Sequence, residues 1–305
     1  MLEIGGSHVL AAVVDTESWT QVGSARRVEL DPAAGADELL ARFARAGAEL
    51  AGGFAGECAG HGEPARRWAV AIPDPFDYRR GVGRFREVGK FEGLDGVDLR
   101  ARLLAVLPWS PTWIGFVNDA DAYALGEWWR GAGVGSARCV GITLGAGVGS
   151  GWIADGRVVD TGPDVPPGGR ANRLSVHGLP LEEAFSSRAL RRRYVELVGE
   201  RGLDQDGLPV QVREIAGRAR DGDGPARTVL RAAADALGDA LGEYLHRFDP
   251  DVVVFGGSMA GAWDLLGPPF LEAAARSGWS GRTEVASDPD RAATIGAAYA
   301  LRGQP

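Results

Sequence analysis

The stretches LEIGGS at residues 2–7 and LGAGVGSG at residues 144–151 decide the fold of this chain. Each is a glycine-rich turn next to β-patterned sequence, one at the start of the chain and the other in its middle. Glycine has no Cβ atom and tolerates positive φ, so such turns can bring backbone N–H groups close to a polyanion. Because the pair Asn118-Asp119 lies between them, the two turns together predict a clamp for nucleotide phosphates.

The composition is that of an ordinary globular protein without a basic surface. The chain has 305 residues, of which 45% are hydrophobic and 24% charged, and this length suggests about two domains. Its formal net charge is −8 and no run of Lys or Arg stands out. A chain of this charge has no long-range attraction for phosphate backbones, so no nucleic acid partner is expected.

Cysteine usage and the opening residues indicate the cytoplasm. Cys58 and Cys139 are the only cysteines, too few for a disulfide framework or a multi-cysteine zinc site, and both are expected to be buried thiols. No basic and apolar leader opens the chain, and no window approaches the roughly 20 apolar residues of a membrane helix. We therefore expect a cytoplasmic protein with no membrane partner.

The histidines show no ligand spacing that would predict a metal site. All four are scattered and each is expected at a turn or on the surface: His8, His61, His177 and His246.

Strand patterns alternate with helix patterns along the whole chain. Strands are expected at residues 1–4, 9–15, 68–72, 113–117, 139–144, 151–154, 157–160, 251–255 and 282–286. Helices are expected at residues 36–50, 99–106, 120–130, 181–199, 212–220, 226–247 and 292–301, with one more after residue 258. The alternation predicts an α/β protein, and the recurrence of hairpin, strand and helix in each half predicts two related domains.

Other folds with glycine-rich turns fit poorly. A dinucleotide fingerprint needs G-x-G-x-x-G or A before a helix, whereas the sixth positions after Gly145 and Gly147 are Ser150 and Trp152, and β-patterned sequence follows. A P-loop needs a lysine at its end, and the only lysine, Lys90, lies elsewhere.

The turn at residues 256–258 follows an apolar strand and ends in a serine, as in the nucleophile elbow of hydrolases. That fold requires a histidine after the serine and the acid, and no histidine follows Ser258. A hydrolase is therefore disfavoured.

Five stretches form an ordered series of motifs over almost the whole chain. Residues 2–15 are similar to D-I-G-G-T-K, residues 118–127 to N-D-A-x-A-A-A-x-G-E, and residues 141–156 to L-G-T-G-V-G-G-G with a trailing D-G. Residues 181–190 are similar to L-E-x-Y-A-S-G-x-A-L and residues 249–258 to P-x-x-I-V-x-G-G. The series resembles the ROK group of bacterial sugar kinases and repressors, part of the actin-like ATPase superfamily.

The resemblance implies the α/β, two-lobed actin-like ATPase (ribonuclease H-like) fold, with an interdomain nucleotide cleft. Residues 1–117 with 288–305 are expected to form the small lobe and residues 118–287 the large lobe. ATP and Mg²⁺ are the implied cofactors, and a homodimer is the oligomer common in the family. Repressors of the family carry a winged helix before the first motif, so a chain that opens on this motif is not expected to be one.

The resemblance also assigns roles to residues. Asp119 would accept the proton of the attacking hydroxyl and Asn118 would hold a neighbouring hydroxyl, although both residue types also cap helices well. Glu3 would orient Mg²⁺ through water. The implied phosphate-binding residues are Gly5, Gly6, Ser7, Gly145, Ala146, Gly147 and Gly149, and the implied adenosine-binding residues are Gly256, Gly257 and Ser258.

The sequence departs from the family in three places. Glu3 stands where the family has Asp, and Ala146 stands where it has Thr. The family's E-x-G-H and cysteine-rich zinc motif is replaced by residues 168–178, which contain no cysteine, so no structural zinc is expected. Arg170 and Arg173 take the positions of the lost sugar-binding residues. Their guanidinium groups suggest an acceptor-rich or anionic substrate, although solvated loop arginines are an equal alternative.

Two further residues are expected near the substrate. Lys90 replaces a family asparagine, although an exposed lysine is the ordinary alternative, and Glu182 keeps the family glutamate that contacts substrate hydroxyls. The predicted function is ATP-dependent phosphorylation of a hydroxyl, primary by expectation, on a sugar, aminosugar or sugar-like cyclitol. The alternative is a catalytically weak sugar- or nucleotide-binding or regulatory protein.

Overall fold

The structure is a computed structural model that describes residues 1–57 and 66–302. Cys58 and His61 therefore lie outside the described residues. The chain divides into two compact units, residues 1–130 with 290–305 and residues 131–289. The predicted boundaries lay at residues 117 and 287, and the difference comes from helix α3 (Asp119–Arg130), which belongs to the first unit.

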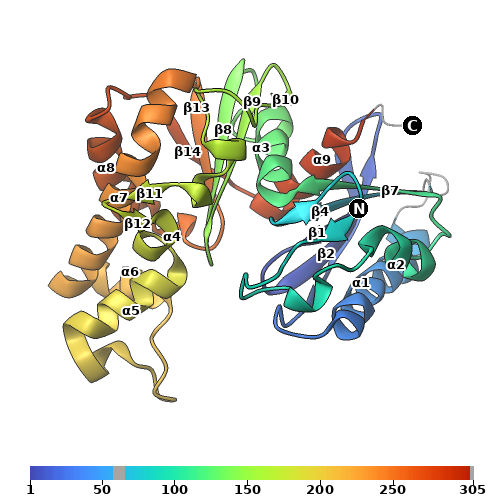
Figure 1. The fold of residues 1–305 in the computed structure, drawn as a ribbon, viewed down its shortest axis with the longest axis horizontal. Helices are drawn as coiled ribbons and strands as arrows, with labels where there is room; N and C mark the ends of the chain where they lie inside the picture. Colours follow the sequence, from blue (N-terminus) through green and yellow to red (C-terminus); the bar gives the residue numbers. More distant parts are fainter. Residues whose placement is uncertain (58–65, 303–305) are drawn as a thin grey trace. The chain divides into compact units, whose positions relative to one another are not determined.

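The first unit is built on a five-stranded sheet of order β3-β2-β1-β4-β7 (Figure 1). β1, β2 and β3 form an antiparallel meander, and β4 and β7 continue the sheet in parallel with β1. The strands are β1 (Leu2–Ile4), β2 (His8–Asp15), β3 (Thr20–Glu29), β4 (Arg67–Ile72) and β7 (Trp113–Asn118). A two-stranded ribbon, β5 (Phe76–Asp77) with β6 (Val82–Gly83), and the 3₁₀ turn η1 (Glu92–Leu94) lie between β4 and α2 (Leu99–Val106).

Side-chain alternation along β1 gives the sheet two different faces. Leu2 and Ile4 are fully buried in a large core with α1 (Ala36–Glu57) and α2. On the other face, small residues pack against α3 and α9 (Pro289–Ala300), with Ala122 and Ala297 in the same cluster as Met1. Glu3 follows Leu2 in the strand, so its side chain lies on this second face.

α3 and α9 approach so closely that only glycine fits at two positions. A Cβ atom at Gly126 would collide with the carbonyl oxygen of Ala292, and one at Gly296 would collide with that of Ala122. The rings of Trp129 on α3 and Tyr299 on α9 stack with centroids 5.0 Å apart. This packing is the physical reason why α3 joins the first unit.

The second unit repeats the same topology with the sheet order β10-β9-β8-β13-β14. β8, β9 and β10 form the antiparallel meander, and β13 and β14 continue the sheet in parallel with β8. The strands are β8 (Arg138–Leu144), β9 (Val148–Ala154), β10 (Arg157–Val158), β13 (Val252–Gly256) and β14 (Thr283–Val285). The two related domains predicted from the sequence are therefore visible as two sheets of matching order.

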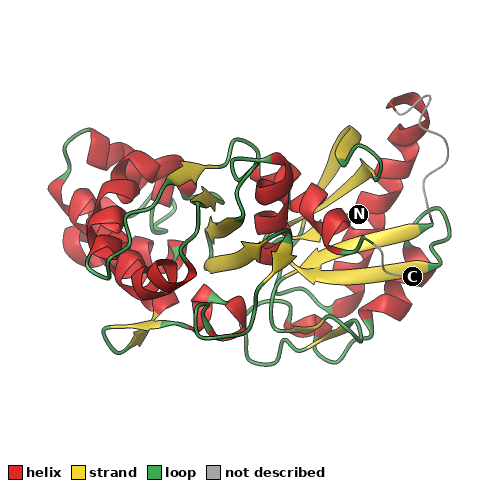
Figure 2. Cartoon of the chain, turned by 90° about the horizontal axis from the view of Figure 1, so that it is seen from above, coloured by secondary structure: helices red, strands yellow, loops and turns green. Residues whose placement is uncertain are grey.

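Helices make up most of the rest of the second unit (Figure 2). They are α4 (Leu181–Ala184), α5 (Ser187–Val198), α6 (Val212–Arg220), α7 (Gly224–Phe248) and α8 (Trp263–Ala275), with the short hairpin β11 (Ser175–Val176) and β12 (Leu179–Pro180) before them. The helix expected at residues 181–199 is broken, because Ser186 has extended backbone and its side chain caps α5 by accepting from the Ala189 N–H. Aromatic side chains fill the core beneath β13, where Phe255 stacks on Trp263 with centroids 3.8 Å apart.

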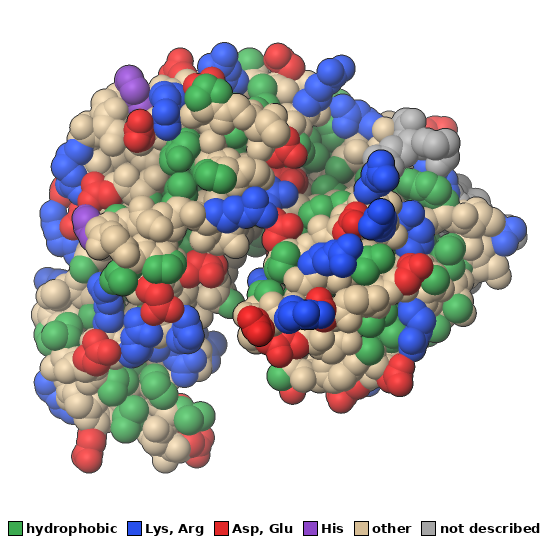
Figure 3. Space-filling view, in the orientation of Figure 1, with side chains coloured by type: hydrophobic (Ala, Val, Ile, Leu, Met, Phe, Trp, Pro, Cys, Tyr) green, Lys and Arg blue, Asp and Glu red, His purple; other side chains and the backbone are tan. Residues whose placement is uncertain are grey.

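Basic and acidic side chains are interspersed over the face shown in Figure 3. Many form ion pairs within or between helices, such as Arg45 with Glu49 at 2.7 Å and Arg220 with Asp264 at 2.6 Å. Exposed pairs of this kind contribute at most about 1 kcal/mol each. Stability must therefore come mainly from the two cores. Of the helices described, none has the length and apolarity to cross a membrane.

Candidate active site

The first glycine turn is a closed β-turn between β1 and β2. The Gly5 N–H donates to the His8 carbonyl oxygen at 2.9 Å, and the Leu30 N–H donates to the Ser7 carbonyl oxygen at 3.0 Å. Gly6 and Ser7 at its tip are exposed. A Cβ atom at Gly5 would lie 3.0 Å from Cε1 of His8, so glycine allows the imidazole to lie against the turn.

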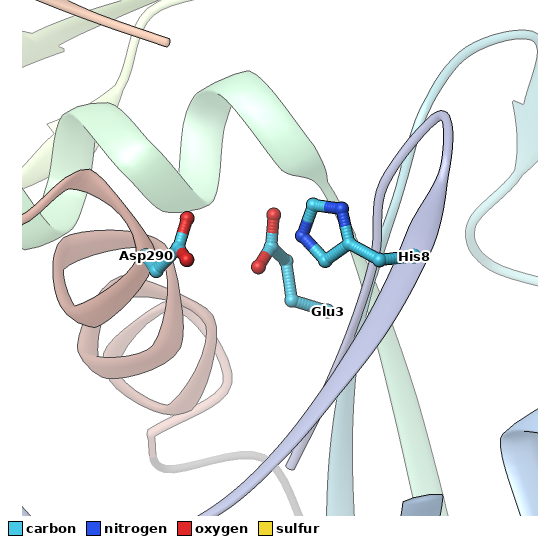
Figure 4. Close-up of side chains that lie close together, drawn as sticks. All are labelled: Glu3, His8 and Asp290. Carbon is cyan, nitrogen blue, oxygen red and sulfur yellow. The ribbon is translucent and has the colours of Figure 1, made fainter. Parts of the chain in front are cut away.

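Glu3 lies at the middle of the first sheet, paired with Leu10 on β2 and with Ala71 on β4. Its Oε2 atom is buried and has no hydrogen-bond partner among the described residues. One ligand atom each of Glu3, His8 and Asp290 lie within 4.8 Å of one another, and the three side chains converge in Figure 4. The fold thus joins the two ends of the chain at one polar site.

Negative charge and burial act together on Glu3. The pKa of its carboxyl group is raised to about 8, mainly by burial and in addition by the charges of Asp290 and Asp119, while Arg27 opposes the rise. Burial and the neighbouring Arg27 lower the pKa of His8. A bound cation would favour the charged form of the Glu3 carboxyl group and so lower its pKa, which fits the Mg²⁺ role predicted for this residue.

Asn118 and Asp119 lie where β7 ends and α3 begins. The Oδ1 atom of Asn118 accepts from the N–H groups of Ala120 and Asp121, both at 3.1 Å, so Asn118 caps the helix. The amide of Asn118 donates to the Tyr78 hydroxyl at 3.0 Å. Of the two roles considered for Asn118, capping is therefore present in the structure, and the contact with a substrate hydroxyl stays a prediction.

Asp119 is half-buried, and its Oδ1 atom accepts from the Ala120 N–H at 2.8 Å. Its charge acts on Glu3, so the predicted base and the predicted metal ligand share one electrostatic environment. Lys90 is half-buried in the loop before η1. Its neighbours fix this loop, since the Gly89 N–H donates to Glu92 at 3.0 Å and the Phe91 N–H donates to the Pro32 carbonyl oxygen at 2.6 Å.

The second glycine turn, between β8 and β9, is held by one side chain and one backbone N–H group from outside the turn. The Val148 N–H donates to Oε1 of Glu182 at 3.1 Å, and a Cβ atom at Gly147 would collide with the same oxygen. The Gly145 N–H donates to the Gly147 carbonyl oxygen at 3.0 Å, and the Ser187 N–H donates to the Gly145 carbonyl oxygen at 2.9 Å. Glu182, predicted to contact substrate, thus supports the predicted phosphate turn.

The other residues assigned to this turn differ in exposure and position. Ala146 is exposed at the tip. Gly149 lies inside β9, where it pairs with Thr143 on β8. The turn between the two strands is therefore residues 145–147, and Gly149 lies outside it.

The predicted adenosine segment lies against the same turn. Gly257 has a φ of +85°, and a Cβ atom there would lie 2.5 Å from the carbonyl oxygen of Leu144. The Met259 N–H donates to that same oxygen at 3.1 Å. A Cβ atom at Gly145 would lie 3.5 Å from Oγ of Ser258. The structure therefore brings residues 145–147 and Gly256-Gly257-Ser258 together.

Arg170 lies on a loop that is fastened to β9 by a buried serine. Oγ of Ser150 donates to the Gly169 carbonyl oxygen at 2.7 Å and accepts from the Ala171 N–H at 2.8 Å. Arg170 itself is half-buried, whereas Arg173 is exposed and its guanidinium donates to the Pro167 carbonyl oxygen at 3.4 Å. The loop that replaces the family's zinc motif is thus held by a hydroxyl from the phosphate motif.

Sequence reasoning missed His8, Asp290 and Ser150. The hairpin register could have placed His8 beside Glu3, because Leu10 is the cross-strand partner of Glu3 and lies two residues from His8. No local pattern could have indicated Asp290, which comes from the other end of the chain. The polar residue Ser150 within a buried strand was the available signal for an anchor.

Comparisons with known proteins agree on one family. Residues 175–303 match the ROK family. The glucokinase of Thermotoga maritima is 29% identical over 262 residues, which is 79% of this chain and 80% of that protein. An N-acetyl-D-glucosamine kinase of Escherichia coli is 32% identical over 154 residues, 47% of this chain and 50% of its own length.

Solved structures extend the similarity to nearly the whole chain. The ROK hexokinase of Thermus thermophilus matches with a TM-score of 0.73 at 27% identity, covering 98% of this chain and 96% of that one. A ROK glucokinase of Streptomyces griseus, solved with glucose and AMPPNP, matches in fold with a TM-score of 0.72 at 24% identity over 97% and 96% of the two chains. The fold class predicted from the sequence, the α/β fold of actin-like ATPases, is confirmed, and the chain is similar to ROK sugar kinases over nearly its whole length.

Proposed function

We propose that this chain is an ATP-dependent carbohydrate kinase that transfers a phosphoryl group to a primary hydroxyl of a sugar, aminosugar or sugar-like cyclitol. Its kinship with glucokinase, N-acetyl-D-glucosamine kinase and ROK hexokinase supports the class of reaction. The identity of the acceptor and of the hydroxyl that is phosphorylated is proposed from individual residues of this chain.

The position of Asp119 carries the proposal. The neighbouring Asn118 caps α3, which leaves the Asp119 carboxylate half-buried at the start of the helix. As the acceptor oxygen bonds to the γ-phosphorus, Asp119 takes the hydroxyl proton, the bond from the γ-phosphorus to its bridging oxygen breaks, and ADP leaves. Phosphoryl transfer depends mainly on position and charge neutralisation, and a fixed carboxylate supplies the position.

Glu3 is the residue that would hold Mg²⁺, through water. Its buried Oε2 atom without a hydrogen-bond partner among the described residues fits a nearby cation. When bound, the metal supplies neutralisation of phosphate charge. Gly5, Gly6 and Ser7 contribute the exposed turn beside it, where backbone N–H groups would meet phosphate oxygens.

In this proposal the second unit binds the rest of the nucleotide. Residues 145–147 would bind phosphate, and Gly256-Gly257-Ser258, which packs against them, would bind adenosine. Glu182 keeps the phosphate turn in shape through the Val148 N–H. The tight approach of Gly257 to Leu144 explains why these two segments stay in register.

The acceptor class is inferred from the residues that differ from the family pattern. Arg170 is half-buried, and Ser150 holds the backbone on both sides of it, through Gly169 and Ala171. The loop therefore fixes the position from which the guanidinium group extends. A guanidinium is a permanent cation with several donors, suited to an acceptor-rich or anionic edge. Lys90, on the first unit, is the second basic residue that we assign to the acceptor.

The test is an ATP-coupled assay of the whole chain over a panel of hexoses, aminosugars and cyclitols. We expect turnover of at least one acceptor and its loss in Asp119→Asn. Phosphorus NMR of the product identifies the hydroxyl that carries the phosphate. Binding of ATP and of an acceptor without turnover of any panel member would overturn the proposal.

A second candidate function is a catalytically weak sugar- or nucleotide-binding protein. Two observations favour it: Glu182 places a carboxylate at the second phosphate turn, and the amide of Asn118 is already engaged by Tyr78. Glu3 and Ala146 in place of the family's Asp and Thr point the same way. The assay above separates the two functions, because a binding protein would retain ligand affinity while showing no turnover.

A further inference from the structure

We propose that, in the nucleotide-free chain, Glu3, His8 and Asp290 form a direct three-ligand site for a divalent transition metal such as Mn²⁺. The first evidence is geometric: one ligand atom from each residue lies within 4.8 Å of the others. Figure 4 shows the imidazole of His8 and the carboxylates of Glu3 and Asp290 directed toward a common point. The inference rests on the proposed function only for its consequences in turnover, since the site lies wholly within the first unit.

Unmatched polar atoms distinguish this group from an ordinary surface cluster. Oε2 of Glu3 and Nε2 of His8 are both buried and have no hydrogen-bond partner among the residues that the structure describes. Buried polar atoms are nearly always paired, because an unpaired one costs roughly 1–3 kcal/mol. A metal ion would pair both atoms at once.

The ligand types select the kind of metal. Imidazole nitrogen with two carboxylates suits first-row transition ions, whereas Mg²⁺ prefers oxygen ligands and keeps several waters. The family pattern has Asp and Lys where this chain has Glu3 and His8. Lysine would place a positive charge at the site, and its replacement by imidazole provides a nitrogen ligand instead.

Arg27 is the resident competitor of the metal. Its guanidinium contacts Nδ1 of His8 at 3.0 Å and Oδ2 of Asp290 at 3.2 Å. Because arginine can only donate, Nδ1 accepts and the proton of the neutral ring is on Nε2. Metal binding at Nε2 requires that proton to move to Nδ1, so Arg27 must release the ring before the metal can bind.

Because Arg27 competes with the metal, the proposal predicts variants that weaken Mn²⁺ binding and a variant that tightens it. His8→Gln and Asp290→Asn remove ligands, so each should weaken Mn²⁺ binding by about 10-fold or more. Arg27→Gln removes a positive charge and frees Nδ1 of His8, so it should tighten Mn²⁺ binding by about 10-fold. A gain of affinity cannot come from misfolding, which makes Arg27→Gln the decisive variant.

The experiment is a titration of Mn²⁺ into the whole, nucleotide-free chain, followed by the electron paramagnetic resonance signal of the free ion. His177→Gln is the matched control, because His177 also faces a carboxylate, Asp239 at 3.5 Å, but is exposed and belongs to the second unit. We expect one saturable site per chain that the control does not change and that excess Mg²⁺ displaces poorly.

Three results would overturn the metal site. The first is the absence of saturable Mn²⁺ binding in both the unaltered chain and Arg27→Gln. The second is an Mn²⁺ affinity that His8→Gln and Asp290→Asn leave unchanged, and the third is an affinity for Mg²⁺ equal to that for Mn²⁺. Turnover is measured separately in the acceptor panel. Mn²⁺ binding without kinase activity would therefore reject the proposed function alone, and kinase activity without Mn²⁺ binding would reject this inference alone.

Discussion

The two glycine turns occupy the same place in two sheets of matching order, yet they are stabilised differently. The turn between β8 and β9 has its Val148 N–H bonded to Glu182, and its glycines are enclosed by neighbouring segments. The turn between β1 and β2 has an exposed tip, and beside it Glu3 and His8 present buried atoms without partners among the described residues. One turn is completed by protein groups, and the other has polar atoms that a ligand could pair.

This difference suggests a division of labour between the units. Proteins rarely keep buried polar atoms unpaired unless a ligand or a chemical role accounts for them. Among the described residues, Glu3 and His8 have such atoms. We therefore propose that the first unit carries the chemistry and that the second unit binds the nucleotide through a turn that protein groups already stabilise. The predictions below test this contrast.

The largest effect should come from Asp119→Asn. Loss of the base should lower kcat by about 10²–10⁴-fold while substrate affinities change little, because proton transfer is the step affected. Folding should be retained, since Asn118 still caps α3. Steady-state kinetics with ATP and the preferred acceptor measures the effect.

Asp98→Asn is the matched control for that substitution. Asp98 caps α2 in the same unit by accepting from the Ala101 N–H at 2.9 Å, and asparagine caps about as well as aspartate. We expect unchanged kcat in this variant. Equal losses in both variants would mean that Asp119 acts through the helix and not on the substrate.

How far the sequence predicted these features depended on whether their signals were local. The helices at residues 99–106 and 212–220 are confirmed at both ends, because their periodic apolar residues and boundaries lie close together in the chain. Strand β3 (Thr20–Glu29) was missed, because it is an edge strand in which only Val22 and Val28 are buried. Polar edge strands carry little of the alternation that identifies strands.

In the candidate site, too, the features with a local sequence signal were predicted and those without one were missed. Asn118-Asp119 and both glycine turns were found because each is a continuous motif. The bond from Val148 to Glu182 and the approach of Asp290 to Glu3 join residues that are distant in sequence, so only the folded chain reveals them. The proximity of His8 to Glu3 was within reach, because hairpin pairing alone places them on one face.

The second prediction compares the same substitution in the two turns. Gly147→Ala must displace the Glu182 carboxylate, so we expect a loss of about 1–3 kcal/mol in the free energy of unfolding. Gly6→Ala should change that free energy by less than about 0.5 kcal/mol, because a Cβ atom there would meet nothing within 4 Å. Urea denaturation measures both. Equal destabilisation by the two variants would remove the structural contrast between the turns.

The third prediction separates two roles of Glu182. If its carboxylate holds the phosphate turn, Glu182→Ala should raise the KM for ATP by about 10-fold, which is the value of one charge-assisted hydrogen bond. Glu182→Gln keeps an oxygen that can accept from the Val148 N–H, so its KM for ATP should stay within a few-fold. A rise confined to the acceptor KM in both variants would instead assign Glu182 to the sugar.

The smallest expected effect belongs to Arg170→Ala. If its guanidinium reaches the acceptor, the acceptor KM should rise about 5-fold, or about 1 kcal/mol, while the KM for ATP stays constant. Arg173→Ala is the matched control, because Arg173 lies on the same loop but is exposed and donates to Pro167. An unchanged acceptor KM in Arg170→Ala would contradict the assignment and would mean that the second unit binds only the nucleotide. A rise of the acceptor KM in Arg170→Ala but not in Arg173→Ala would support acceptor recognition by residues of the second unit as well. The contrast between the units would then apply only to the chemical step.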